Sequence, residues 1–114
     1  MLFNDLKNML SESQLKVLGF LAYTGNSMGD RTMSSFCRVF GMDELAVRAI
    51  IRELFFNKLL ENNSTVVSLN VLPILMWLVE NKPEWIDGYK GACISGQVFT
   101  NTESLNFVSN LINN

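Results

Sequence analysis

Histidine is absent from this chain of 114 residues, and its absence excludes several classes of chemistry. Histidine is the commonest general base and metal ligand at neutral pH, so most serine and cysteine hydrolase sites and the usual zinc fingers are excluded. No other set of residues pairs a nucleophile with a base. We therefore expect a protein without enzymatic activity that needs neither a metal nor a cofactor.

The sequence is also poor in cysteine and contains no long apolar run. Its two cysteines, Cys37 and Cys93, lie far apart, and Cys37 falls in an apolar helical pattern where a thiol acts as a small hydrophobic side chain. We therefore do not favour a disulfide. No stretch reaches the roughly 18 consecutive apolar residues of a membrane-spanning helix, and the N-terminus lacks the apolar region of a signal peptide. We expect a chain of the reducing cytoplasm, with no membrane among its partners.

Neither sign of charge is in marked excess. Nine Lys and Arg residues stand against eleven Asp and Glu residues, which gives a formal net charge of -2. Without a global positive field, long-range electrostatics does not draw the chain toward nucleic acid. Any contact with DNA must therefore depend on a local group of basic residues.

What remains is the composition of one packed domain. The chain is 48% hydrophobic and 18% charged, with only two prolines, which excludes a disordered or collagen-like protein. A chain of this length rarely forms two independent cores. We expect a single domain over residues 1–114.

Hydrophobic periodicity and capping residues predict a mainly helical chain with one short β-hairpin. Ser11 and Gln14 have the capping-box spacing for a helix that Gly25 ends, and Asp43 is a good N-cap for another. The predicted elements are an amphipathic segment at 1–10, helices at 11–24, 32–40 and 44–57, a hairpin around 62–64, a helix at 73–81 with Pro73 in its first turn, one turn at 83–88, irregular structure or a short strand at 88–96, and a last helix at 100–112.

Apolar stripes at both ends of the chain indicate surfaces that must be covered. At the N-terminus, Leu2, Phe3 and Leu6 share one face, which either packs on its own domain or forms an interface with another subunit. At the C-terminus, Leu105 and Val108 line the last predicted helix. These two segments are the candidates for a homodimer interface.

The segment between Met33 and Leu54 has a spacing of small, glycine and aliphatic residues that is typical of two helices joined by a tight turn. Cys37 is followed four positions later by Gly41, and six positions after that by Val47. The small side chain lets the helices approach, the glycine takes the turn, and the aliphatic side chain fills the space between them. With the hairpin that follows, residues 11–70 resemble a winged helix-turn-helix domain.

This resemblance implies a mainly α fold, in which a three-helix core and a short β-hairpin are extended by N- and C-terminal helices, residues 71–114 forming the C-terminal extension. It also implies a non-enzymatic DNA-binding domain, as found in transcriptional regulators and other DNA-associated proteins, acting as a homodimer. The third helix is then the recognition helix. The implied DNA contacts are Leu45, Arg48, Ala49 and Arg52 on this helix, with Arg31, Arg38 and Lys58 as candidate phosphate contacts.

The charges of this region favour an alternative, because winged helices also serve as protein-interaction modules of larger nucleic-acid-handling proteins. From residue 30 to residue 61, five basic residues balance five acidic ones, and residues 62–65, where the wing is expected, contain no Lys or Arg. Glu44 lies one helical turn before Arg48 and can pair with it, which would make this arginine less available to DNA.

The apolar residues on the outer face of the third helix suit a protein partner at least as well as DNA. Leu45 and Phe56 lie on this face, and contiguous exposed apolar side chains mark interaction sites. For Phe55 and Phe56, burial beneath the hairpin or the C-terminal helices is the structural alternative. We therefore add Phe56 to the candidate interface residues.

Overall fold

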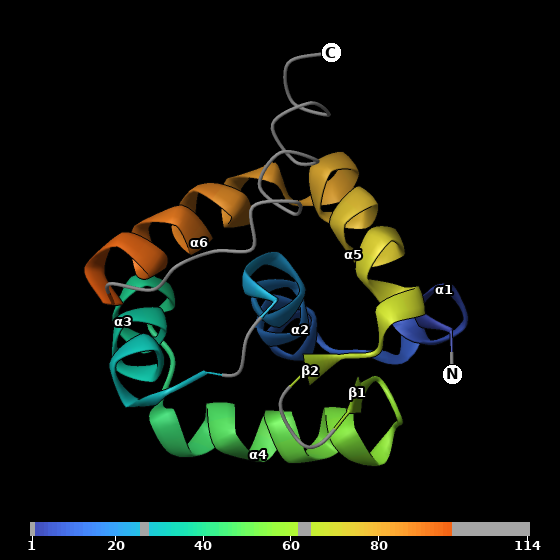
Figure 1. Ribbon diagram of the computed structural model, residues 1–114, viewed down its shortest axis with the longest axis horizontal. Coiled ribbons are helices and arrows are strands. Elements are labelled where there is room, and N and C mark those ends of the chain that lie inside the picture. The colour runs from blue at the N-terminus through green and yellow to red at the C-terminus, as the bar shows by residue number, and fades with distance from the viewer. Residues whose placement is uncertain (1, 26–27, 62–64, 97–114) are drawn as a thin grey trace.

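The computed structural model describes residues 2–25, 28–61 and 65–96, and this part of the chain is mainly helical (Figure 1). Two short antiparallel strands, β1 (Leu60–Glu61) and β2 (Thr65–Val66), pair with Leu60 opposite Val66. None of the helices in the described ranges combines the length and the apolar composition that crossing a bilayer requires. The helices are α1 (Phe3–Leu6), a short 3-10 helix η1 (Lys7–Met9), α2 (Glu12–Thr24), α3 (Asp30–Phe40), α4 (Glu44–Phe56), α5 (Ser68–Asn81) and α6 (Pro83–Gly96).

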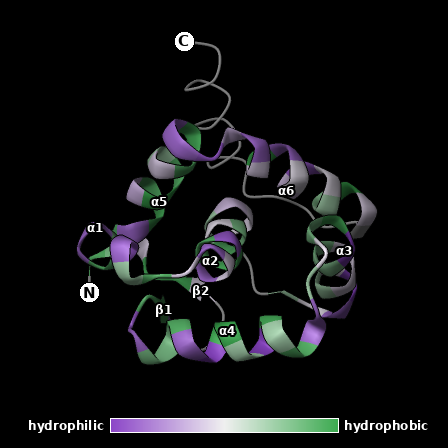
Figure 2. Cartoon of the chain, turned by 180° about the vertical axis from the view of Figure 1, so that it is seen from behind, coloured by the Kyte–Doolittle hydropathy of each residue, from purple (hydrophilic) through white to green (hydrophobic). Residues whose placement is uncertain are grey.

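Helix α2 forms the centre of the fold. In Figures 1 and 2 it is surrounded by α3, α4, α5 and α6, and its residues from Val17 to Thr24 are all buried. The predicted capping box is confirmed: the Gln14 backbone N–H donates to Ser11 Oγ, and the Ser11 N–H donates to Gln14 Oε1. Gly25 ends the helix with a φ of 70°, a left-handed conformation that glycine adopts without strain.

Helices α3 and α4 are joined by the tight turn that the sequence predicts. Gly41 ends α3 with a φ of 64°, and the Asp43 side chain caps α4 by accepting a hydrogen bond from the Ala46 N–H. Val47 and Leu54 are fully buried on the inner face of α4. The order of α2, α3, α4, β1 and β2 is compatible with a winged helix, and α3 begins two residues earlier than predicted.

The stretch from Pro83 to Gly96 is one continuous helix, so the prediction of one turn followed by irregular structure or a strand is wrong. Gly88 acts here as a point of close approach rather than as a helix breaker, because a Cβ atom at this position would lie 2.6 Å from Cζ of Phe40 on α3. Tyr89, which the sequence places in a loop, is fully buried, and its hydroxyl donates to the Lys16 carbonyl oxygen at 2.7 Å.

Helix α5 starts at Ser68, so Pro73 lies inside the helix and not in its first turn as predicted. Proline in a helix interior removes one backbone hydrogen bond and costs about 3 kcal/mol. Burial of Ile74, Leu75 and Leu78 between α5 and its neighbours offsets this cost. Tertiary packing therefore sets the start of α5.

The N-terminal apolar stripe packs mostly on its own domain. Phe3 and Leu6 are buried, whereas Leu2 is 54% exposed. The Phe3 N–H donates to Oδ1 of the fully buried Asn70 at 2.8 Å, which ties α1 to the first turn of α5. The side chains of Phe3 and Leu6 are therefore not accessible to a second subunit, and this correction removes them as interface residues. The last predicted helix, with Leu105 and Val108, lies outside the described residues.

Candidate binding face on helix α4

The outer face of α4 carries a stripe of four side chains, which we call the α4 face: Leu45, Ala49, Arg52 and Phe56. Their spacing places them on one side of the helix, along a line of about 16 Å. Leu45 is 76% exposed and Phe56 is 79% exposed, while Ala49 is half-buried. Apolar and polar residues follow one another along α4 in Figure 2. The α4 face is thus an exposed strip with apolar residues at both ends.

Arg48 lies beside this stripe and is held by two carboxylates. Its Nη2 atom lies 2.8 Å from Glu44 Oε1, which confirms the pairing that the sequence predicts, and 3.6 Å from Oδ1 of Asp30 at the start of α3. The hydrogen bond to Glu44, with a smaller effect of Asp30, raises the pKa of the Arg48 guanidinium. A ligand phosphate would have to compete with both carboxylates for this side chain.

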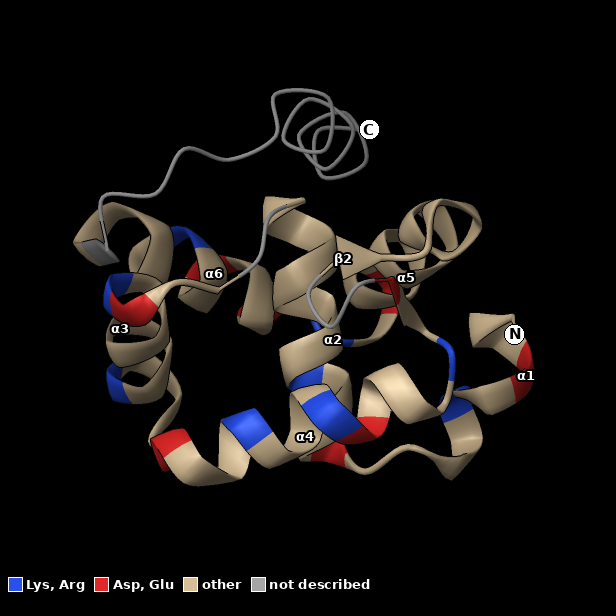
Figure 3. Cartoon of the chain, turned by 60° about the horizontal axis from the view of Figure 1, so that its bottom comes forward, with Lys and Arg blue, Asp and Glu red and all other residues tan. Residues whose placement is uncertain are grey.

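Arg52 is exposed, and in the described part of the chain it has no hydrogen-bond or ion-pair partner. The neighbouring Glu53 does not pair with it, because Glu53 Oε2 accepts a hydrogen bond of 2.7 Å from Gln14 Nε2 on α2. Figure 3 shows basic and acidic residues mixed along α4. Arg52 is the arginine of the α4 face with its hydrogen-bond donors open to a partner.

The two phenylalanines at the end of α4 differ in how far the described part of the chain covers them. Phe55 is 37% exposed, Phe56 is 79% exposed, and their rings meet edge to face with centroids 6.3 Å apart. Among the described residues, neither the hairpin strands nor α5 and α6 bury Phe56, and the last predicted helix lies outside the described residues. The exposure of Phe56 is a property of the fold that the sequence pattern alone left open.

The structure brings two of the three candidate phosphate contacts together. Arg31 and Arg38 line one polar surface pocket of ≈ 450 Å³ between α3 and the end of α6. Lys58 follows the far end of α4, about 20 Å along that helix from its start beside α3. The remaining residues that line this pocket are Asp30, Ser34, Ser35 and Ser95.

The groups that often carry chemistry are not activated. Burial raises the pKa of the Cys93 thiol to about 11. Burial also raises the pKa of the Cys37 thiol, with a further contribution from the Glu44 and Asp43 carboxylates. Both thiols are protonated at neutral pH, so neither is a ready nucleophile. Among the described residues, no group of three Cys, Asp or Glu side chains is placed to hold a metal ion.

Comparisons of the chain with protein-family models, with curated protein sequences and with solved structures give no match.

Proposed function

We propose that this chain is a non-enzymatic winged-helix module that binds another protein through the α4 face. The observation that carries the proposal is the exposure of Leu45 and Phe56, each more than three quarters exposed, at the two ends of one stripe. Burying an apolar side chain of this size contributes about 1.5–3 kcal/mol to the free energy of binding. A partner that removes both Leu45 and Phe56 from water is therefore favoured.

The composition of the α4 face also favours a protein. Energetically dominant residues of protein interfaces are often aromatic residues and arginine, and this stripe places Arg52 one turn from Phe56. A docked apolar partner would desolvate the Arg52 guanidinium, so we expect the partner to place a carboxylate or carbonyl oxygens against it. A phosphate backbone would leave the Phe56 ring without an apolar contact.

DNA recognition is the second candidate function, and two observations favour it. Arg52 has open donors on the outer side of the third core helix, the recognition helix of a winged helix. Arg31 and Arg38 line one pocket on α3, the helix that crosses the DNA backbone in helix-turn-helix proteins. Against DNA, Arg48 is engaged by Glu44 and Asp30.

A pair of experiments separates the two functions. Affinity capture with the wild-type chain and with a Leu45→Ala/Phe56→Ala double variant, followed by calorimetry with the purified partner, tests the protein proposal. The matched control is Ile94→Ala, because Ile94 is also 79% exposed but lies on α6. We expect binding by the wild type and the Ile94→Ala control and a loss of at least about 100-fold in the double variant.

The DNA arm uses fluorescence anisotropy with mixed-sequence duplexes from low to physiological salt. The protein proposal expects no saturable binding. Two results together would favour the DNA function over the protein proposal. The first is salt-dependent DNA binding that Arg52→Ala weakens, and the second is a Leu45→Ala/Phe56→Ala variant that binds a protein partner like the wild type.

A further inference from the structure

Helix α5 carries a second exposed apolar surface, which we call the α5 ridge: Leu69, Leu72 and Met76. These side chains are 56%, 49% and 43% exposed. Their spacing of three and four residues places them on one line along the helix, away from the inward-facing Ile74 and Leu78. This 3-4 spacing is the pattern by which one helix packs against another.

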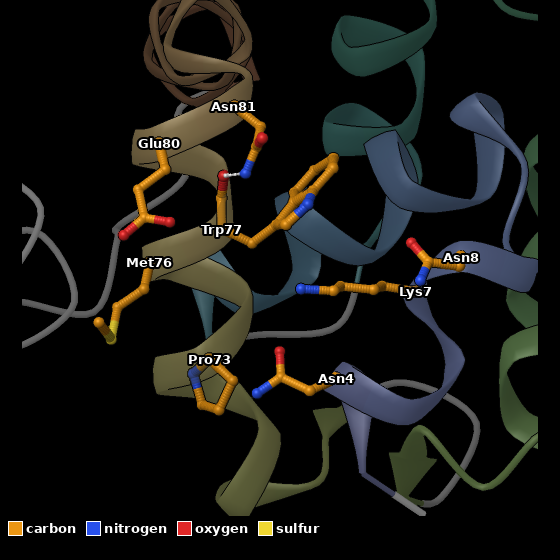
Figure 4. Close-up of a pocket in the computed structure, with 8 residues that line it drawn as sticks. All are labelled: Asn4, Lys7, Asn8, Pro73, Met76, Trp77, Glu80 and Asn81. Carbon is orange, nitrogen blue, oxygen red and sulfur yellow. Dashed lines mark hydrogen bonds between the residues drawn. The ribbon is translucent and has the colours of Figure 1, made fainter.

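A groove runs beside the ridge, between the α1–η1 segment and α5 (Figure 4). Its volume is ≈ 570 Å³, and Trp77 forms part of its lining. In Figure 4 the Lys7 side chain extends across the groove toward α5, whereas Met76 and Glu80 point away from Lys7. Each chain therefore presents a ridge and a groove side by side. The other residues of the lining are Asn4, Asn8, Pro73 and Asn81.

The charged residues of this surface are complementary to each other. Lys7 from η1 and Glu80 from α5 both line the groove, and within the described residues neither has an ion-pair partner. A two-fold axis exchanges the two sides of a surface, so it can place Lys7 of one copy against Glu80 of another, and the reverse pair forms at the same time.

We infer that a second copy of this chain covers the α5 surface, in a two-fold dimer with α5 packed against α5 of the other copy. In this arrangement the ridges of the two copies pack against each other at the centre, and the mainly polar side chains that line the two grooves lie around them. Leu2, which precedes the Asn70-bound Phe3, lies near the start of the ridge and is half-exposed. This dimer uses a surface separate from the α4 face, so it goes beyond the proposed function.

Sedimentation velocity on the full chain, from about 1 μM to about 1 mM, tests the dimer. We expect a concentration-dependent species with twice the 12.9 kDa chain mass. Met76→Glu places a charge on the ridge, at its C-terminal end, and we expect it to raise the dimer dissociation constant at least about tenfold. Ile94→Glu, at a more exposed position on α6, is the control and is expected to dimerise like the wild type. Circular dichroism verifies that both variants are folded.

A charge exchange tests the two-fold arrangement. Lys7→Glu and Glu80→Lys each place like charges together across the axis, so each is expected to weaken the dimer about threefold to tenfold, and the double variant is expected to restore it. A wild-type chain that remains monomeric throughout, whatever else covers the ridge, overturns the proposal. So does a Met76→Glu chain that dimerises like the wild type, or a double variant that restores nothing.

Discussion

Replacing Gly88 by alanine tests the close approach of α6 to α3. A Cβ atom at Gly88 would lie 2.6 Å from Cζ and 3.0 Å from Cε1 of Phe40. The Phe40 ring is confined, because its centroid lies 4.9 Å from that of Phe36 and 5.4 Å from that of Tyr89. The added methyl group must therefore displace this ring or shift α6.

The expected magnitude follows from two opposing effects. Alanine is a better helix former than glycine by about 1 kcal/mol in a helix interior. Overpacking a well-filled contact costs about 1–3 kcal/mol. Gly91 lies on the same helix, and a Cβ atom there would meet nothing within 4 Å. The difference between Gly88→Ala and Gly91→Ala therefore isolates the overpacking cost, about 1–3 kcal/mol.

Urea unfolding followed by far-UV circular dichroism measures this difference directly. Gly91→Ala is expected to raise the free energy of unfolding above that of the wild type by about 0.5–1 kcal/mol. Gly88→Ala is expected to have a lower free energy of unfolding than Gly91→Ala, and its melting temperature is expected to be lower by roughly 4 °C for each kcal/mol of this difference. If the two alanine variants unfold at the same urea concentration, the contact between α6 and the Phe40 ring is not tight, and this reasoning is refuted.

Three further predictions test the capping, the buried polar contact and the ionisable groups. Lys58 ends α4 in a left-handed conformation with a φ of 61°; its N–H donates to the Phe55 carbonyl oxygen, and the Leu59 N–H donates to the Leu54 carbonyl oxygen. Because glycine adopts a positive φ without strain, Lys58→Gly is expected to raise the free energy of unfolding by about 0.5–1 kcal/mol. A loss of stability in urea unfolding would contradict this. Asn70→Leu leaves the Phe3 N–H without its buried acceptor. It is therefore expected to lower the free energy of unfolding by about 1–3 kcal/mol and to speed hydrogen exchange at the Phe3 amide. Unchanged exchange at this amide would argue against the contact. Burial raises the pKa of Cys93 to about 11 and the pKa of Tyr23 to about 12, so the folded state keeps protons that the unfolded state loses. Stability is expected to be fully present below about pH 9 and to fall as the pH rises from 9 to 12, and a free energy of unfolding that stays constant over this window would contradict the burial of both groups.

Local rules predicted the first half of the fold because the interactions that define it are close in sequence. The Ser11–Gln14 capping box, the left-handed Gly41 and the Asp43 cap each involve residues within one helical turn. Such signals depend little on the rest of the chain. The helices at 11–24, 32–40 and 44–57 were therefore predicted to within a few residues.

The second half was harder to predict because tertiary contacts outweigh local preferences there. Glycine is a poor helix former, yet Gly88 is required where α6 approaches Phe40. Pro73 indicates a helix start, yet the buried Asn70 and the apolar residues around it extend α5 back to Ser68. Neither effect is visible without knowing which helices are neighbours.

In the candidate site, too, contacts within one helix were predicted from the sequence and contacts between helices were not. The pairing of Glu44 with Arg48 follows from their spacing on one helix, and it was predicted. The second carboxylate on Arg48 comes from Asp30, on another helix, and no sequence signal indicates this contact. The α5 ridge was also missed, because α5 is apolar on nearly all sides and only the packing distinguishes Ile74 and Leu78 from the exposed Leu69.

The two proposed surfaces make a joint prediction that neither makes alone. Helices α4 and α5 lie on different sides of the central α2 (Figure 1), so a dimer through α5 leaves both α4 faces open. Two linked faces bind an immobilised partner with a higher apparent affinity than one face in solution. Met76→Glu is therefore expected to weaken binding to a densely coated surface about tenfold or more while leaving the affinity in solution calorimetry unchanged, whereas Phe56→Ala is expected to weaken both. Equal losses in both assays for Met76→Glu would mean that the dimer forms part of the partner site, and the two surfaces could no longer be treated as independent.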